Sequence, residues 1–194
     1  MSEKLNRPTE EEAKQAVRTL LAWAGDNPDR EGLKDTPKRV VKAYQEFFSG
    51  YGVDTAKILG KTFEEIEGYD DIVLLKNMRF ESHCEHHIAP FIGTAHIAYL
   101  PDKKVVGISK IARILDVFAK RLQTQETMTS QIANALQESL APKGVAVYID
   151  AEHQCMTTRG IHKPGTTTIT TAMIGEFKSN VDMKNNFFKL INIS

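Results

Sequence analysis

The sequence lacks the features that mark membrane proteins, secreted proteins and proteins with a strong net charge. No apolar run approaches the roughly 20 residues needed to span a bilayer, and residues 1–20 lack the apolar core of a signal peptide. These absences predict a cytoplasmic protein without a membrane partner. Lysine plus arginine and aspartate plus glutamate are equal at 25 each, so no overall field favours nucleic acid as a partner.

Cysteine is also scarce, with two residues, Cys84 and Cys155, in a chain of 194. Two cysteines in a cytoplasmic protein rarely form a structural disulfide, so they are either buried apolar residues or residues for metal binding or catalysis. Histidines flank both of them, in ESHCEHHIAP at 81–90 and in AEHQCMTTRG at 151–160. Two separated segments that each pair a cysteine with a histidine suggest one site assembled by folding.

The composition is that of one globular domain, because 41% of the residues are hydrophobic and 26% are charged. Helical periodicity and capping residues predict helices that start after Thr9, Thr36, Ser109, Thr124 and Asn180, and a short one near 54–59. Alternating or β-branched segments predict strands at 71–80, 91–100, 105–108, 145–151 and 166–174. No repeat, low-complexity segment or interdomain linker interrupts this pattern.

Cys84, His87 and Cys155 are thiolate and imidazole ligands of the kind that zinc accepts. Three protein ligands leave a coordination position open for water, as in a catalytic site. If the strand at 145–151 continues as an extended chain, His153 and Cys155 project to the same face. The alternative is a closed structural site with a fourth ligand from one of three histidines, His83, His86 or His153.

Further polar groups in the two segments favour the catalytic alternative, since a structural site does not need them. They are His86, His153, Glu85 and Glu152. A neutral histidine beside a metal site can transfer protons near neutral pH, and His153 is the first candidate for that role. His96 and His162 are isolated and receive no role.

Basic residues at two helix positions are candidates for binding an anion. Lys110 and Arg113 lie in the first turn expected after Ser109, where a helix N-terminus already favours negative charge. Arg39 and Lys42 lie side by side on another predicted helix, which by itself indicates a solvated face.

Five motifs in this order, SHCEHH, VGISKIARI, RLQTQE, AEHQCMTTRGI and GTTTITTAM, resemble the zinc-dependent GTP cyclohydrolase I family. The resemblance extends from residue 36 to residue 179. It implies an α+β tunnelling fold, in which an antiparallel four-stranded sheet carries two helices on one face and follows an N-terminal helical arm. One catalytic domain, 1–194, would comprise the arm at 1–60 and the core at 61–194.

The resemblance implies hydrolysis of GTP at C8 of the purine, with release of formate and formation of 7,8-dihydroneopterin triphosphate, the first step of folate and tetrahydropterin biosynthesis. Cys84, His87 and Cys155 fall on the family's zinc ligands, and the water that zinc activates would attack C8. His153 matches the histidine that protonates the purine at N7. His86 matches a histidine near the ribose that acts in later proton transfers or in positioning.

Glu126 matches the carboxylate that binds the guanine edge, and Gln125 with the backbone around Ile108 and Ser109 would complete base recognition. The triphosphate would be bound by Lys110, Arg113 and Arg159, and by Arg39 and Lys42 from a neighbouring subunit. Family members form rings, usually a decamer of two stacked pentamers. Two alternatives remain open: another enzyme of the same fold, such as a pterin synthase or a nitrile reductase, and a zinc-stabilised assembly without catalysis.

Overall fold

The computed structural model describes residues 7–60, 62–63 and 69–193, and the chain forms two compact units, Met1–Ser49 and Gly50–Ser194. The unit boundary therefore precedes the boundary expected at 60/61, and residue 61 itself lies outside the described residues. No helix among the described residues is long and apolar enough to cross a bilayer.

The N-terminal unit is helical, with α1 (Glu10–Trp23), a 3-10 turn η1 (Glu31–Leu33) and α2 (Thr36–Phe47). The capping box predicted at Thr9 is confirmed, because its hydroxyl accepts from the Glu12 N–H at 3.2 Å and the Glu12 carboxylate accepts from the Thr9 N–H at 2.7 Å. The N-cap predicted at Thr36 is wrong: Asp35 occupies that position and Thr36 begins the helix. Pro37 still lies in the first turn, where a missing N–H costs nothing.

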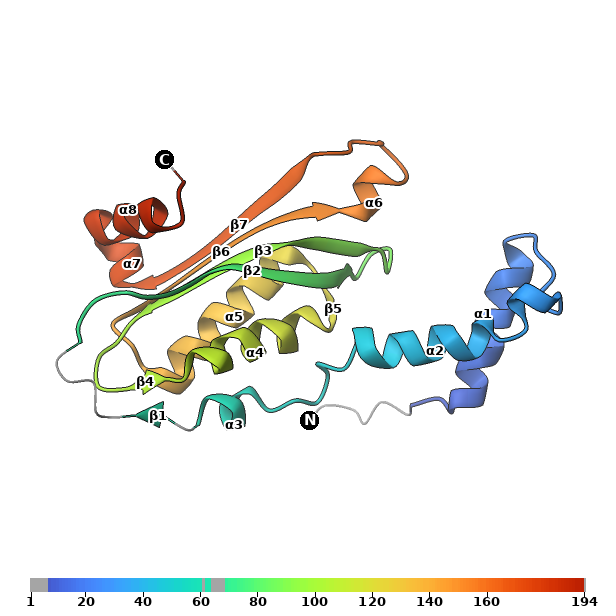
Figure 1. Ribbon diagram of the computed structural model, residues 1–194, viewed down its shortest axis with the longest axis horizontal. Coiled ribbons are helices and arrows are strands. Elements are labelled where there is room, and N and C mark those ends of the chain that lie inside the picture. The colour runs from blue at the N-terminus through green and yellow to red at the C-terminus, as the bar shows by residue number, and fades with distance from the viewer. Residues whose placement is uncertain (1–6, 61, 64–68, 194) are drawn as a thin grey trace. The chain divides into compact units, whose positions relative to one another are not determined.

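The second unit is built on one sheet with the strand order β5-β2-β3-β6-β7 (Figure 1). Its four long strands are antiparallel, which confirms the expected α+β architecture. They are β2 (Val73–Cys84), β3 (Pro90–Leu100), β6 (Gly144–His153) and β7 (Thr167–Gly175). A strand that the sequence did not predict, β5 (Leu122–Gln123), adds a short parallel pairing beside the end of β2.

Each face of this sheet has its own helices, because side chains alternate along the strands. The two central helices α4 (Ile108–Ala119) and α5 (Gln125–Leu140) pack on one face and bury Ile97, Val147 and their neighbours. The C-terminal helices α7 (Glu176–Ser179) and α8 (Val181–Leu190) share the other apolar cluster with Ala98, Ala146 and Tyr148. The predicted cap at Asn180 is confirmed, since its side chain accepts from the Asp182 N–H at 3.0 Å.

Two predictions around residue 107 are wrong. The strand expected at 105–108 is only β4 (Val105–Val106), which pairs with β1 (Thr62–Phe63) in a separate two-stranded sheet. Gly107, not Ser109, is the N-cap of α4, so Ser109 is the second residue of that helix. Gly107 has the extended backbone of an N-cap, with φ -58° and ψ 130°, and no side chain caps the helix.

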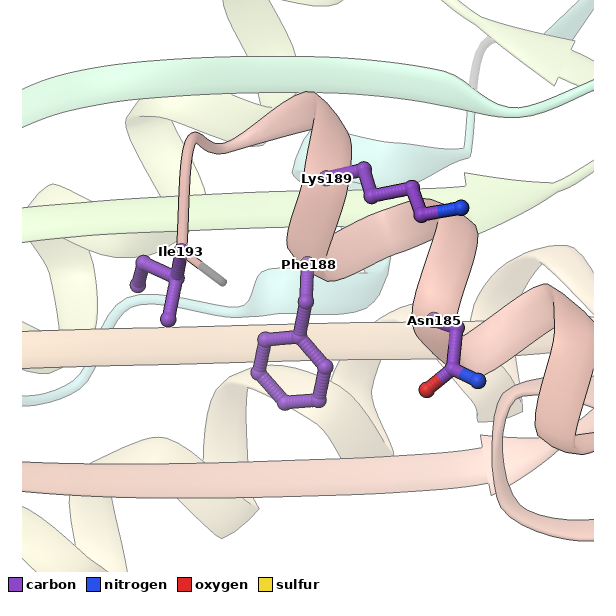
Figure 2. Close-up of a pocket in the computed structure, with 4 residues that line it drawn as sticks. All are labelled: Asn185, Phe188, Lys189 and Ile193. Carbon is purple, nitrogen blue, oxygen red and sulfur yellow. The ribbon is translucent and has the colours of Figure 1, made fainter.

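Short elements complete the core unit. The helix α3 (Thr55–Leu59) confirms the short one predicted nearby, and the fully buried Leu59 joins the cluster of α4 and α5. On α8, an apolar pocket of about 390 Å³ is lined by Asn185, Phe188, Lys189 and Ile193 (Figure 2). It lies toward the opposite end of this unit from the end of β2 and from α6 (Gln154–Thr157) (Figure 1).

Candidate metal and active site

Cys84 is the last residue of β2, and a tight turn brings His87 back beside it. The Cys84 N–H donates to the carbonyl of Ala89 at 2.8 Å, and the Ile88 N–H donates to the carbonyl of Cys84 at 2.8 Å. Ile88 adopts φ 53°, a left-handed conformation that is rare for a β-branched residue. The turn is therefore locally strained at Ile88.

Cys155 reaches the same place from the other side of β3, but not by the predicted route. The strand β6 ends at His153 and the helical turn α6 follows, so the expectation of an extended chain through Cys155 is wrong. The donor atoms of Cys84, His87 and Cys155 nevertheless all lie within 4.8 Å of one another. This group is the only one of its kind among the described residues.

The donor set fits a divalent metal ion with a preference for sulfur and nitrogen ligands. Burial raises the pKa of the Cys155 thiol, and the neighbouring Cys84 raises it further, while Arg159 partly offsets both. Metal binding requires cysteine ligands as thiolates, so a cation at this position would favour loss of the Cys155 proton. His83 is not in this group, because it is the neighbour of Cys84 on a strand and so faces the other side of the sheet.

His153 lies beside the Cys-His-Cys group and is held on two sides. It pairs with Phe91 across the β3–β6 ladder, and their rings stack with centroids 4.7 Å apart and planes 4° apart. Its Nε2 lies 2.8 Å from Oε1 of Gln125. Burial lowers the pKa of His153 below 6.5, with a partly opposing effect from Glu126. A proton placed on this ring is therefore given up more easily than one on an exposed histidine.

These residues line one open pocket of about 240 Å³. It brings together the Cys-His-Cys group and four of the other predicted site residues, His86, Gln125, Glu126 and His153. His86 is exposed, with Nδ1 3.6 Å from the Cys84 sulfur and Nε2 3.8 Å from the Glu85 carboxylate. Gln125 is only 1% exposed, so its amide is directed into the protein rather than into the open pocket.

Sequence patterns did not assign five residues to this site. The pocket lining includes Gln123, Thr124, Met156 and Thr168, and Phe91 holds the His153 ring. The alternation of the threonine-rich segment at 166–174 could have indicated that Thr168 and Thr170 share a face. The position of Phe91 opposite His153 required the strand register, which the sequence does not state.

Other predicted residues do not line this pocket. Ile108, Ser109, Lys110 and Arg113 lie in the first two turns of α4, whose other end leads to β5 beside Cys84 (Figure 1). Because α4 has 12 residues, it is about 18 Å long and its first turn lies about 12 Å from its last. Arg159 is exposed in the loop after α6, close enough to Cys155 to affect the pKa of its thiol.

Arg39 and Lys42 are exposed on α2 in the N-terminal unit. The Arg39 guanidinium lies 3.5 Å from the Asp35 carboxylate, an exposed pair of the kind that contributes little to stability. Their role as contributions from a neighbouring subunit stays a prediction.

Comparison with known proteins agrees with the site. Residues 13–192 match the family model of GTP cyclohydrolase I. The chain is 64% identical over 185 residues to GTP cyclohydrolase 1 of Maricaulis maris, covering 95% of this chain and 90% of the relative. It is 60% identical over 191 residues to GTP cyclohydrolase 1 of Allorhizobium ampelinum, covering 98% of this chain and 95% of the relative.

A solved structure, the archaeosine synthase QueF-Like in the apo form, matches 55% of this chain and 96% of that chain with 19% sequence identity and a TM-score of 0.46. That likeness is too distant to support a statement about function. The family match covers nearly the whole chain, as do the relatives named above. The chain therefore belongs to the GTP cyclohydrolase I family.

Proposed function

We propose that this protein hydrolyses GTP at C8 of the purine, releases formate and forms 7,8-dihydroneopterin triphosphate, the first step of folate and tetrahydropterin biosynthesis. The observation that carries the proposal is one pocket that joins a Cys-His-Cys group to His153 and Glu126. A metal ligand set, a proton donor and a carboxylate for the base are the three kinds of group that this reaction requires.

Zinc is the proposed metal, with Cys84, His87 and Cys155 as its ligands. Two sulfurs and one imidazole suit zinc better than magnesium or calcium, which prefer oxygen ligands. Three protein ligands leave one position of a tetrahedron open. When bound there, zinc would supply Lewis-acid activation of the water that attacks C8.

The guanine base is proposed to enter this pocket. Glu126 is exposed at the first turn of α5 and lines the pocket, so its carboxylate can accept two N–H groups from the guanine edge. Adenine does not offer the same two donors, which gives a basis for selecting GTP. His153, with its lowered pKa, would deliver a proton to N7 and so make C8 more electrophilic. His86 is proposed for positioning or later proton transfers near the ribose.

The triphosphate is proposed to bind residues from more than one copy of the chain. The pocket of about 240 Å³ is below the roughly 300 to 1,000 Å³ that is usual for small-molecule sites. Arg159 lies near Cys155, whereas Lys110 and Arg113 lie in the first two turns of α4, away from the end that leads to β5. A second copy that presents its α4 N-terminus would complete the site, together with Ser109 and the backbone at Ile108. Arg39 and Lys42 of a neighbouring copy are proposed as further phosphate ligands.

A ring of subunits would provide these contributions, and we propose the decamer of two pentamers as the assembly. In its support, β7 forms one edge of the sheet within the described residues and has nine residues available for pairing. An edge strand that pairs with a neighbouring copy closes a ring in the manner of a β-barrel. Sedimentation of the purified protein tests the subunit number. Cytoplasmic location is part of the proposal, and cell fractionation tests it.

Incubation of the zinc-loaded protein with GTP tests the reaction. We expect formate in equal amount to a pterin that becomes fluorescent after oxidation. His153→Ala should bind GTP but form no product, and His162→Ala, which alters an exposed histidine outside the pocket lining, should keep full activity. Absence of product from the wild-type protein would refute the proposal. Consumption of a pterin triphosphate in place of GTP would instead indicate another enzyme of the same fold.

A further inference from the structure

The buried side chain of Gln125 has a defined orientation, because of what surrounds its nitrogen. Nε2 lies 2.8 Å from the carbonyl oxygen of Thr168 and 3.3 Å from that of Ile149. Carbonyl oxygens only accept hydrogen bonds, so the amide nitrogen must face them and the amide oxygen must face away. Oε1 then points at Nε2 of His153 at 2.8 Å. An amide oxygen only accepts, so the hydrogen of this bond belongs to Nε2 of His153.

Two threonines continue this network, and the direction of their hydrogen bonds is also defined. The Thr129 hydroxyl lies 2.7 Å from the carbonyl oxygen of Gln125 in the preceding turn of α5, so its hydrogen is used there. The Thr170 hydroxyl lies 2.7 Å from the Thr129 hydroxyl and must therefore donate to it. Its remaining lone pairs accept from Gln125 Nε2, which is 3.1 Å away.

We propose that Thr170 and Thr129 are positioning residues that act through Gln125 to hold His153 as the Nε2–H tautomer. Every group that faces the Gln125 amide nitrogen is then an acceptor, and a flipped amide would place its oxygen against three oxygens. Stacking on Phe91 fixes the plane of the His153 ring, and the network fixes which nitrogen within that plane carries the hydrogen. Nδ1 is left with the free lone pair, which makes it the nitrogen that exchanges protons with substrate.

The inference rests on the proposed role of His153, but the network predicts a result that is separate from turnover. If Thr129 loses its hydroxyl, the Thr170 hydrogen is free to turn toward Gln125 and can donate to a flipped amide oxygen. If Thr170 loses its hydroxyl, one of the three oxygens that oppose the flip is removed. The carbonyls of Thr168 and Ile149 still oppose the flip, so both changes weaken the preference for the Nε2–H tautomer of His153 without abolishing it. Neither change touches the metal ligands or the base-binding carboxylate.

Steady-state kinetics of the metal-loaded protein test the inference with four variants. Thr170→Val and Thr129→Val should each lower kcat roughly three- to tenfold, the loss expected for one neutral hydrogen bond, with KM for GTP within about twofold of wild type. Thr170→Ser keeps the hydroxyl and should therefore have the same kcat as the wild type. The matched control is Thr171→Val, an exposed neighbour on the same strand that faces the other side of the sheet, and it should be unchanged.

Solid-state ¹⁵N NMR of protein with ring-labelled histidine gives the second readout. The His153 signals are assigned by their loss in His153→Asn. In the wild-type protein Nε2 should be protonated and Nδ1 not, and both valine variants should show a larger share of the Nδ1–H tautomer than the wild type. A wild-type His153 with hydrogen on Nδ1, valine variants with unchanged kcat, or a loss that appears equally in KM would each overturn the inference. If the wild type does not convert GTP, the proposed function fails, but the NMR result still decides the tautomer.

Discussion

Gly93 lies where β3 and β6 come closest together, so its replacement by alanine tests how the sheet supports the site. The residue is paired with Ala151 in the register of the two strands. A Cβ atom at Gly93 would lie 2.0 Å from the carbonyl oxygen of Asp150 and 2.6 Å from the Cα of Ala151. Ordinary contacts of a Cβ begin at 3.4 Å, and both obstacles are backbone atoms. The two central strands would therefore have to move apart by more than an ångström.

That movement should be costly. Overpacking in a core costs about 1 to 3 kcal/mol. A separation of this size also breaks about two hydrogen bonds of the ladder, at about 1 kcal/mol each. The expected loss in the free energy of unfolding is thus about 3 to 5 kcal/mol, or about 6 to 20 °C in the melting temperature of a domain of this size. Because Phe91 and His153 pair on the same ladder, kcat for GTP should fall as well.

Thermal unfolding followed by circular dichroism, together with the GTP assay, measures both effects. Gly32→Ala is the control, because the atom nearest to its added Cβ is the movable guanidinium end of Arg30 at 2.8 Å. That variant should stay within about 0.5 kcal/mol of wild type. A Gly93→Ala protein that melts within about 2 °C of wild type and keeps its kcat would contradict the close approach of the two strands.

Three further predictions concern the metal, the base and the pH dependence of stability. Cys155→Ser should lose bound metal and activity but keep its secondary structure and oligomer size, because the sheet with α4 and α5 forms the core; metal analysis and circular dichroism check this. Glu126→Gln should raise KM for GTP roughly ten- to hundredfold, since one of two charge-assisted acceptors becomes a donor, and Glu138→Gln on the same helix should not. Burial, and then Lys76, lower the pKa of His96 below 6.5, against a smaller opposite effect of Asp150. The unfolded chain therefore takes up a proton at pH values where the folded one does not, so stability is lost as pH falls below 6.5, and His96→Gln should flatten that decline in melting temperature.

Clear outcomes would contradict these three predictions. Unfolding of the Cys155→Ser protein would mean that the metal supports the fold rather than the reaction. An unchanged KM in Glu126→Gln would place the base elsewhere. An equal pH dependence of melting in wild type and His96→Gln would mean that His96 does not charge on unfolding in this range.

The long elements of the second unit could be predicted because their patterns are local. Alternation and β-branched residues defined the four long strands, and Thr124 and Asn180 cap the helices they were expected to cap. The failures concern short segments in which local preference is weak. Val105 and Val106 favour a strand, but the helix begins at Ile108, and nothing in QCMT indicated the helical turn that ends β6.

The Cys-His-Cys group could be predicted because the chain has only two cysteines and a histidine lies within three residues of each, a pattern typical of metal binding. The surroundings of His153 could not be predicted, because Gln125 and Phe91, which contact it, and Thr170, which contacts Gln125, lie on three different elements. Only the strand register and the placement of α5 bring them together. The distance from the start of α4 to the pocket could likewise not be predicted from a short motif, because it depends on how α4 is placed in the fold.

The three candidate metal ligands follow two strands that are not neighbours, since Cys84 ends β2, His87 lies in the turn after it, Cys155 lies in α6 after β6, and β3 lies between β2 and β6. Cys84 and His87 come from one side of β3, and Cys155 comes from the other side. In the chain, Cys155 follows both central helices, α4 and α5. Ligands so far apart along the chain meet only after the slow, long-range strand pairing is complete. The ion therefore cannot nucleate folding as it does in a zinc finger. During synthesis the chain would acquire its metal late, and a metal-free protein should already possess the complete sheet.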